Sequence, residues 1–101
     1  MNKDRQREAC AKEDGYTKTH DGTWYYKAKG LPKLPPTYDT HDDMQRLLDG
    51  LTNDEGEAYH QELITIIIRD GGQYSWFDVH KATVDQKREA YLKAKELWEE
   101  A

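Results

Sequence analysis

Histidine, cysteine and serine side chains are the groups in this chain that could hold a metal ion or attack a substrate. The four histidines lie far apart, and no two have the spacing at which one helix presents a pair of metal ligands. A site made of His41, Asp43 and His60 is geometrically conceivable, but ligand spacing does not favour it. Cys10 is the only cysteine, which excludes an internal disulfide, and Ser75 lacks the Gly-x-Ser-x-Gly turn of a nucleophilic serine. We therefore expect no catalytic residue, no bound metal, no cofactor and no enzymatic activity.

Carboxylates form the densest group of charged residues. The segment 39–62 holds eight acidic residues and a single basic one, Arg46, in a chain whose net charge is -5. Such a surface repels phosphate groups, so we expect no direct contact with nucleic acid, and it complements a basic protein surface. The alternative is a solvated helix surface that keeps the protein soluble. The candidate partner-binding residues are Asp42, Asp43, Asp54, Glu55 and Glu57.

Aromatic residues gather in two segments, 23–28 and 73–81, whose composition favours strands. Helices on both faces of a sheet would bury these side chains in the core, which is the interpretation we favour. An uncovered face would instead form an exposed platform for a protein or for a nucleotide base. For a nucleotide, stacking and phosphate contacts are expected from Trp24, Tyr26, Lys27, Lys29 and Lys33.

Capping residues and apolar spacing predict four helices that position these groups. The first covers residues 2–13 and has a frayed start. The second begins after Thr40, and the third begins at the Thr-Asn-Asp-Glu capping box at 52–55, so that the two helices meet at a corner. We favour helix over strand for 63–68, because its apolar residues continue the stripe of the third helix. The last helix begins after Thr83.

These elements predict an α+β domain in the order α-β-α-α-β-α, with a short antiparallel sheet. The proline-rich segment 30–36 interrupts regular structure and connects the elements on either side. A chain of 101 residues has room for one domain, so we expect a single domain over 1–101, with its N-terminal helix within 1–15. The longest apolar run is too short to cross a membrane, and no apolar N-terminal run predicts a signal peptide. We therefore expect a cytoplasmic protein without membrane contact.

Three segments of the chain resemble a known family. They are Pro-Pro-Thr-Tyr-Asp at 35–39, Leu-Thr-Asn-Asp-Glu at 51–55, and Ala-Thr-Val-Asp-Gln-Lys-Arg-Glu-Ala-Tyr-Leu at 82–92, followed by Trp98-Glu99. Together they resemble the phage ABA sandwich domain family, small proteins encoded by bacteriophages and prophages. The similarity covers about residues 23–99. It consists of residues at which structural elements begin or end, rather than of catalytic motifs.

The family resemblance implies an α/β/α layered sandwich that acts in the cytoplasm of a phage-infected bacterium. The chain departs from the family at His41-Asp42-Asp43-Met44, where an Asn-Ala-Met-like tract is usual. The family has no single established activity, so no functional residue is carried over from it.

Together, these observations predict an accessory protein that binds and inhibits a host protein with a basic surface. One example is an inhibitor that covers the nucleic-acid-binding surface of a defence nuclease. The alternative function is a nucleotide-binding sponge that sequesters a defence signal, and a structural role in the virion comes third. A homodimer is compatible with the sequence.

Overall fold

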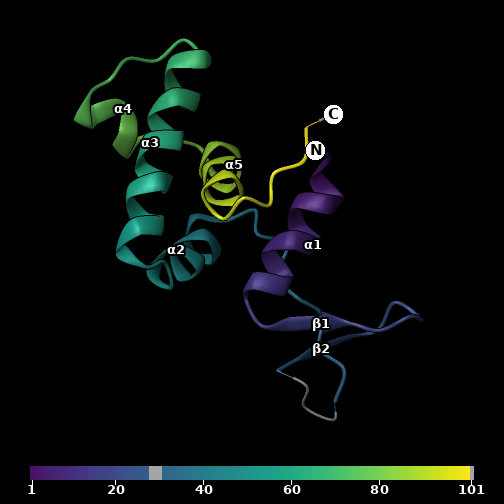
Figure 1. Cartoon of the computed structure of the whole chain (residues 1–101). Helices are drawn as coiled ribbons and strands as arrows, with labels where there is room; N and C mark the ends of the chain where they lie inside the picture. Colours follow the sequence, from purple (N-terminus) through teal and green to yellow (C-terminus); the bar gives the residue numbers. More distant parts are fainter. Residues whose placement is uncertain (28–30, 101) are drawn as a thin grey trace.

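The computed structural model describes residues 1–27 and 31–100, and the described residues form five helices and one two-stranded antiparallel sheet (Figure 1). The elements are α1 (Lys3–Glu13), β1 (Tyr16–Lys18), β2 (Trp24–Tyr26), α2 (His41–Asp49), α3 (Asn53–Arg69), α4 (Trp76–His80) and α5 (Val84–Ala94). The predicted α+β class and the antiparallel sheet are therefore confirmed. None of the described helices combines the length and the apolar character needed to cross a bilayer.

The prediction of a second strand at 73–81 is wrong. Residues Trp76–His80 form the helix α4, which begins where the Ser75 hydroxyl accepts a hydrogen bond from the Asp78 amide at 3.1 Å. Strand preference of aromatic residues depends on a neighbouring strand, and this segment packs against the helix α3 instead. The order of elements is thus α-β-β-α-α-α-α rather than α-β-α-α-β-α.

The predicted first strand is present, and its partner is a strand that the sequence did not reveal. β2 pairs antiparallel with β1, with Tyr16 opposite Tyr26. The Asp21-Gly22 turn joins the two strands, and Gly22 adopts a φ of 85°, a conformation that favours glycine. Figure 1 shows the hairpin beside the C-terminal end of α1, away from α3 and α4.

Helix starts follow the predicted caps. The Thr40 hydroxyl accepts a hydrogen bond from the Asp43 amide at 3.1 Å. Capping boxes open α3 and α5, with Thr52 and Thr83 as the capping residues. Because α3 continues to Arg69, the apolar segment 63–68 is helical, as we favoured.

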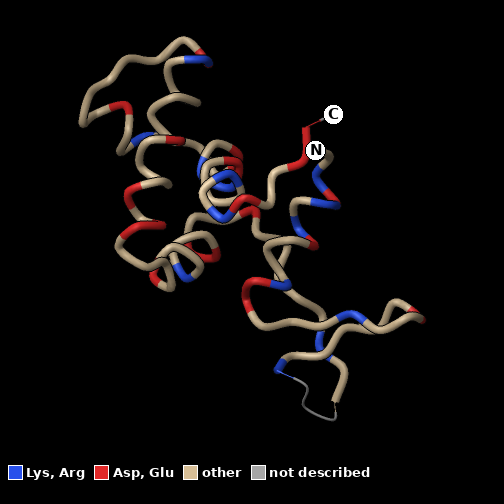
Figure 2. The backbone as a smooth tube through the Cα atoms, in the orientation of Figure 1, with Lys and Arg blue, Asp and Glu red and all other residues tan. Residues whose placement is uncertain are grey.

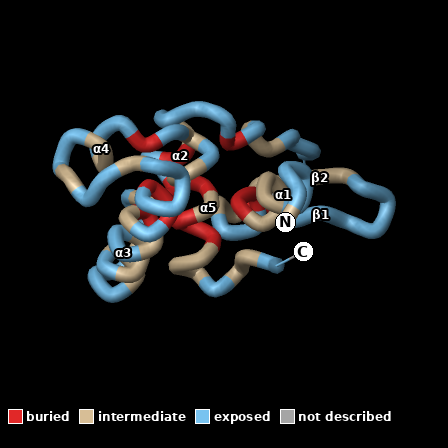
Figure 3. The backbone as a smooth tube through the Cα atoms, turned by 90° about the horizontal axis from the view of Figure 1, so that it is seen from above, coloured by how far each residue is buried: buried red, intermediate tan, exposed pale blue. Residues whose placement is uncertain are grey.

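The core consists of two clusters of buried side chains that meet at α5. One lies between α1, the hairpin, α2 and α5, and the other lies between α3 and α5. The first includes Cys10, Tyr38, Met44 and Leu92, and the second includes Ile66. Figure 3 shows the buried segments, in red, gathered around α5. The position of α5 thus determines how the two halves of the molecule are held together.

A buried arginine joins three parts of the chain at this centre. Arg88 on α5 is 1% exposed. Its guanidinium donates to the Gln6 side chain at 2.9 Å and to the Tyr38 carbonyl at 2.7 Å. It also donates to the carboxylates of Asp39 at 3.1 Å and Asp85 at 2.5 Å. Arg88 therefore connects α1, α5 and the loop that leads into α2.

Candidate functional site

The candidate acidic residues lie at the two ends of α2. Asp42 and Asp43 occupy the first turn of α2, whereas Asp54 and Glu55 occupy the first turn of α3 and Glu57 follows them. A helix of this length spans about 13 Å, which separates the two groups along α2. Figure 2 shows acidic positions, in red, on both helices. The structure thus places the five residues on two consecutive helices rather than in one tight cluster.

Two of these five acids have partners within the protein. Glu55 closes the capping box through the Thr52 amide at 3.0 Å and accepts a hydrogen bond from Lys95 at 2.8 Å. The Lys95 ammonium and the Thr52 amide hold the pKa of Glu55 below its usual value. Asp43 is half-buried and lies 3.4 Å from the guanidinium of Arg46. Both acids therefore hold the helices in place.

The remaining three acids are free to meet a partner. Asp42, Asp54 and Glu57 are exposed, and none forms an ion pair or a side-chain hydrogen bond with another described residue. Their charges are therefore compensated only by solvent and by the amides at the helix starts. An exposed, uncompensated carboxylate is the kind of group that contributes to attraction towards a basic surface.

The residues predicted for nucleotide binding are only partly available. Trp24 and Tyr26 are half-buried and pack against the first core cluster. The ammonium groups of Lys27 and Lys33 lie 5.2 and 5.1 Å from the centre of the Tyr26 ring. A stacking base would compete with these cation–π contacts. Lys29 lies outside the described residues.

An open cleft of about 440 Å³ lies beside Tyr26. Its lining includes Lys33 and Arg46. The Arg46 guanidinium is already paired with Asp14 at 2.7 Å, and so is not free to hold a phosphate. Lys33 is the lining cation without a carboxylate partner among the described residues.

A groove that the sequence did not reveal lies between α2, α3, α4 and α5. Its volume is about 580 Å³, and its lining is His41, Gln45, Leu48, Tyr59, His60, Leu63, Trp76, Val79, His80 and Lys87. Among the described residues that line the groove, none is acidic. Three of the four histidines of the chain line this groove, each from a different helix. The sequence predicts a strand for the segment that contains Trp76, so it does not point to this groove.

Two contacts define the polar and the aromatic side of the groove. The Trp76 ring stacks on the His80 ring, with 5.2 Å between centroids and 13° between planes. The Lys87 ammonium lies 3.2 Å from Nδ1 of His41, to which it donates a hydrogen bond when that nitrogen is unprotonated. The groove therefore combines an aromatic surface with a cation.

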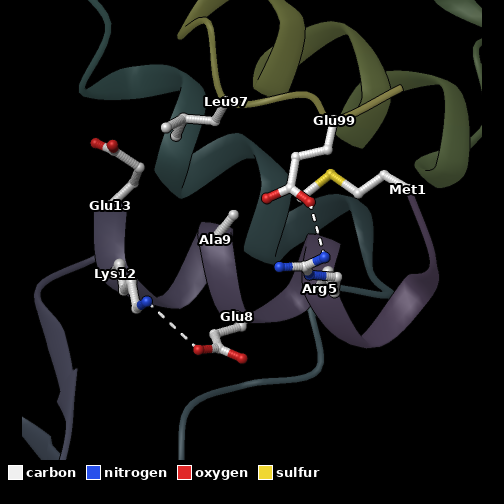
Figure 4. A pocket seen from close by; sticks show the side chains of 8 residues that line it. All are labelled: Met1, Arg5, Glu8, Ala9, Lys12, Glu13, Leu97 and Glu99. Atoms are coloured by element: carbon white, nitrogen blue, oxygen red, sulfur yellow. Dashed lines mark ion pairs between the residues drawn. The ribbon is translucent and has the colours of Figure 1, made fainter. Parts of the chain in front are cut away.

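Figure 4 shows another hollow, of about 300 Å³, between α1 and the C-terminal segment. Its charged groups neutralise one another: Arg5 pairs with Glu99 at 3.0 Å, and Lys12 pairs with Glu8 at 3.4 Å. Ala9 and Leu97 line it between these pairs. The Arg5–Glu99 pair joins the C-terminal segment to α1, and Glu13, the remaining charged residue of the lining, pairs with Lys95 at 3.6 Å.

Cys10 and Ser75, the two candidate nucleophiles in the sequence, both have structural roles. Burial raises the pKa of the Cys10 thiol to about 12, so very little of the reactive thiolate exists at neutral pH. The Ser75 hydroxyl caps α4. Over residues 1–27 and 31–100, no three His, Cys, Asp or Glu side chains are grouped as a metal site would require.

The chain matches no protein-family model, no curated protein and no solved structure. The features of this chain that bear on function are therefore those of its surface, namely the free acids, the acid-free groove and the exposed aromatic side chains.

Proposed function

We propose that this chain is a binding protein of phage origin that attaches to a host protein and inhibits it. The exposed acids of α2 and α3 would face a basic surface of that host protein. The observation that carries the proposal is that Asp42, Asp54 and Glu57 are exposed and unpaired within the described chain. The family resemblance supports the phage origin and the cytoplasm of an infected bacterium as the place of action.

Inhibition follows from electrostatic competition. A basic groove that binds nucleic acid gains affinity from phosphate contacts, and carboxylates at a similar spacing compete for the same cations. The internal pairs of Asp43 with Arg46 and of Glu55 with Lys95 stabilise the two helices that carry the free acids. Less conformational entropy is then lost on binding.

The resemblance also motivates a finer fold proposal, the layered α/β/α sandwich over residues 23–99. This arrangement requires helices on both faces of the sheet. Superposition of an experimental structure of this chain on a family member would test it.

Affinity capture from bacterial lysate tests the function. The variant Asp42→Asn, Asp54→Asn, Glu57→Gln removes the free acids without removing a buried contact. The matched control Asp4→Asn, Glu96→Gln, Glu100→Gln removes three exposed acids elsewhere and has the same net charge as the acid variant. We expect wild type and control to capture the same host protein and the acid variant to lose it. Equal capture by both variants would contradict the proposal.

Nucleotide sequestration is the second candidate function. The observation in its favour is the cleft of about 440 Å³ beside Tyr26, with Lys33 as a cation that has no carboxylate partner among the described residues. A nucleotide bound there would raise the melting temperature of the protein, since a ligand that binds only the folded state stabilises it. A set of linear and cyclic nucleotides without any such increase would exclude this function.

A further inference from the structure

Large apolar side chains are exposed on and around α4. The exposed fractions are 76% for Trp76, 72% for Tyr74 and 55% for Phe77, and Ile68 at the end of α3 is 53% exposed. Only 36% of the residues of this chain are hydrophobic. Exposing four large apolar side chains to water therefore gives up burial that would stabilise the fold. A concentration of exposed tryptophan, tyrosine and phenylalanine is typical of protein interfaces.

The acid-free groove adjoins this aromatic surface, because Trp76 belongs to both. Apolar side chains from three helices line the groove: Leu48 from α2, Leu63 from α3 and Val79 from α4. A hollow of about 580 Å³ accommodates one or two large side chains of a partner. The shape and lining therefore suit an apolar anchor residue.

The charges around the groove favour a negatively charged partner. Lys87 is half-buried and has no carboxylate partner among residues 1–27 and 31–100. Lys81 lies 4.2 Å from the centre of the Phe77 ring and is likewise unpaired there. Asp78, the acid of α4, turns away to accept a hydrogen bond from the Gln73 amide at 2.8 Å. The groove lining and α4 with its capping Lys81 thus carry two lysines against the one carboxylate of Asp78, in a chain whose net charge is -5.

We propose that the groove and the α4 aromatic surface bind an acidic segment of a partner protein. An aliphatic or aromatic side chain of the segment enters the groove, while its carboxylates pair with Lys87 and Lys81. The aromatic side chains of α4 cover the apolar residues on either side of the anchor. None of the free acids Asp42, Asp54 and Glu57 lines the groove, so this inference rests on other residues than the proposed function does.

A second copy of this chain is a poorer occupant. Outside the α4 surface, the large apolar side chains found exposed in the described chain are Leu31 and Leu34. These flank Lys33 in a segment, 31–36, without an acidic residue. A copy therefore offers basic rather than acidic character beside its exposed apolar side chains, which does not complement Lys81 and Lys87.

A bound nucleotide also explains less of the surface. It would place a base against Trp76 and a phosphate near Lys87, but it would leave Tyr74, Phe77 and Ile68 in water. An extended or helical protein segment covers all of them at once.

Selection from a random library of 16-residue peptides displayed on yeast tests the proposal, with the full chain as the target. We expect the enriched peptides to carry several Asp or Glu residues and at least one Leu, Ile, Phe or Trp. The dissociation constant of an enriched peptide is then measured by fluorescence anisotropy. Trp76→Ser and the double variant Lys81→Glu, Lys87→Glu should each weaken binding at least about tenfold.

The controls separate the site from general effects. Leu34→Ser removes an equally exposed apolar side chain, and Lys3→Glu with Lys12→Glu makes the same change of charge elsewhere, so both should bind as wild type does. Ile68→Ser should also weaken binding. Because Ile68 lies on α3, this variant tests the same surface without a substitution that could unfold the short helix α4.

Four results of the peptide experiments would overturn the proposal. They are the absence of any enriched peptide, enrichment of basic peptides, unchanged affinity in the Trp76 and Lys81/Lys87 variants, and displacement of the peptide by AMP alone. A dimer of wild type that Trp76→Ser dissociates in sedimentation velocity would also overturn it, because a second copy would then be the occupant.

Discussion

Replacing Arg88 with methionine removes the hydrogen bonds that join α1, α5 and the loop before α2, but keeps most of the apolar side-chain volume. The guanidinium is 1% exposed and donates to the carbonyl of Tyr38 at 2.7 Å. Tyr38 is itself fully buried, and its φ of 58° is unusual for a tyrosine. Its carbonyl would be left without a partner in a region that water does not reach.

The magnitude follows from the burial of each acceptor. Loss of a charged donor to a buried carbonyl costs about 1.5–3 kcal/mol. The side chains of Asp39 and Asp85 are 37% and 70% exposed, so water replaces much of what they lose, and each adds less than about 1 kcal/mol. We therefore expect Arg88→Met to lower the free energy of unfolding by about 2–4 kcal/mol, a large part of the ~5–15 kcal/mol typical of a domain.

Urea unfolding followed by tryptophan fluorescence measures this change. With a slope of roughly 1–2 kcal/mol per molar urea, the midpoint should fall by about 1–4 M. The control is Arg69→Met, because Arg69 pairs with Glu89 and Asp70 while its side chain is 52% exposed. That variant should lose less than about 1 kcal/mol. Equal losses in the two variants would refute the assignment of Arg88 as the central connection.

Three further predictions concern the caps, the pH dependence and the cysteine. Thr52→Ala removes one side of the α3 capping box and should cost about 1 kcal/mol in urea unfolding, whereas Thr65→Ala, within the same helix, should cost less. Burial raises the pKa of Glu89, but hydrogen bonds from Arg69 and Lys93 outweigh it and hold that pKa below 4.5. Glu89 thus stabilises the fold above its unfolded pKa, and this stability is lost as the pH falls through the folded pKa. Glu89→Gln should therefore flatten the acid side of a stability–pH curve, and an unchanged curve would contradict the assignment. The Cys10 thiol, with its pKa raised to about 12, should resist iodoacetamide at pH 7 in the folded protein and react once urea unfolds it, as mass spectrometry would show.

Helix starts were predictable from the sequence because a cap is a local interaction. Thr52 and Glu55 lie three residues apart, and their mutual hydrogen bonds need nothing from the rest of the chain. The turn at Asp21-Gly22 is equally local. In contrast, the aromatic residues at 73–81 predict a strand, but strand preference depends on neighbouring elements that the local sequence does not show.

The site was harder to predict because its contacts span long distances in the chain. The acids at 42–57 were visible, but the pairing of Glu55 with Lys95 joins residues 40 positions apart and removes one acid from the free set. The groove needs α2, α3, α4 and α5 in place, and the contact of His41 with Lys87 spans 46 positions. No pattern of neighbouring residues predicts such long-range contacts.

The salt dependence of affinity tests the proposed function most directly. The host protein captured by wild type would be titrated with the protein at 50 and 500 mM NaCl. Three exposed charge pairs are worth about 1–3 kcal/mol in total, so we predict that the Asp42, Asp54, Glu57 variant binds about tenfold more weakly at low salt. Its affinity should also change less with salt than that of wild type or of the Asp4, Glu96, Glu100 control. The same affinity and the same salt dependence in all three proteins would show that the acids of α2 and α3 do not bind the partner.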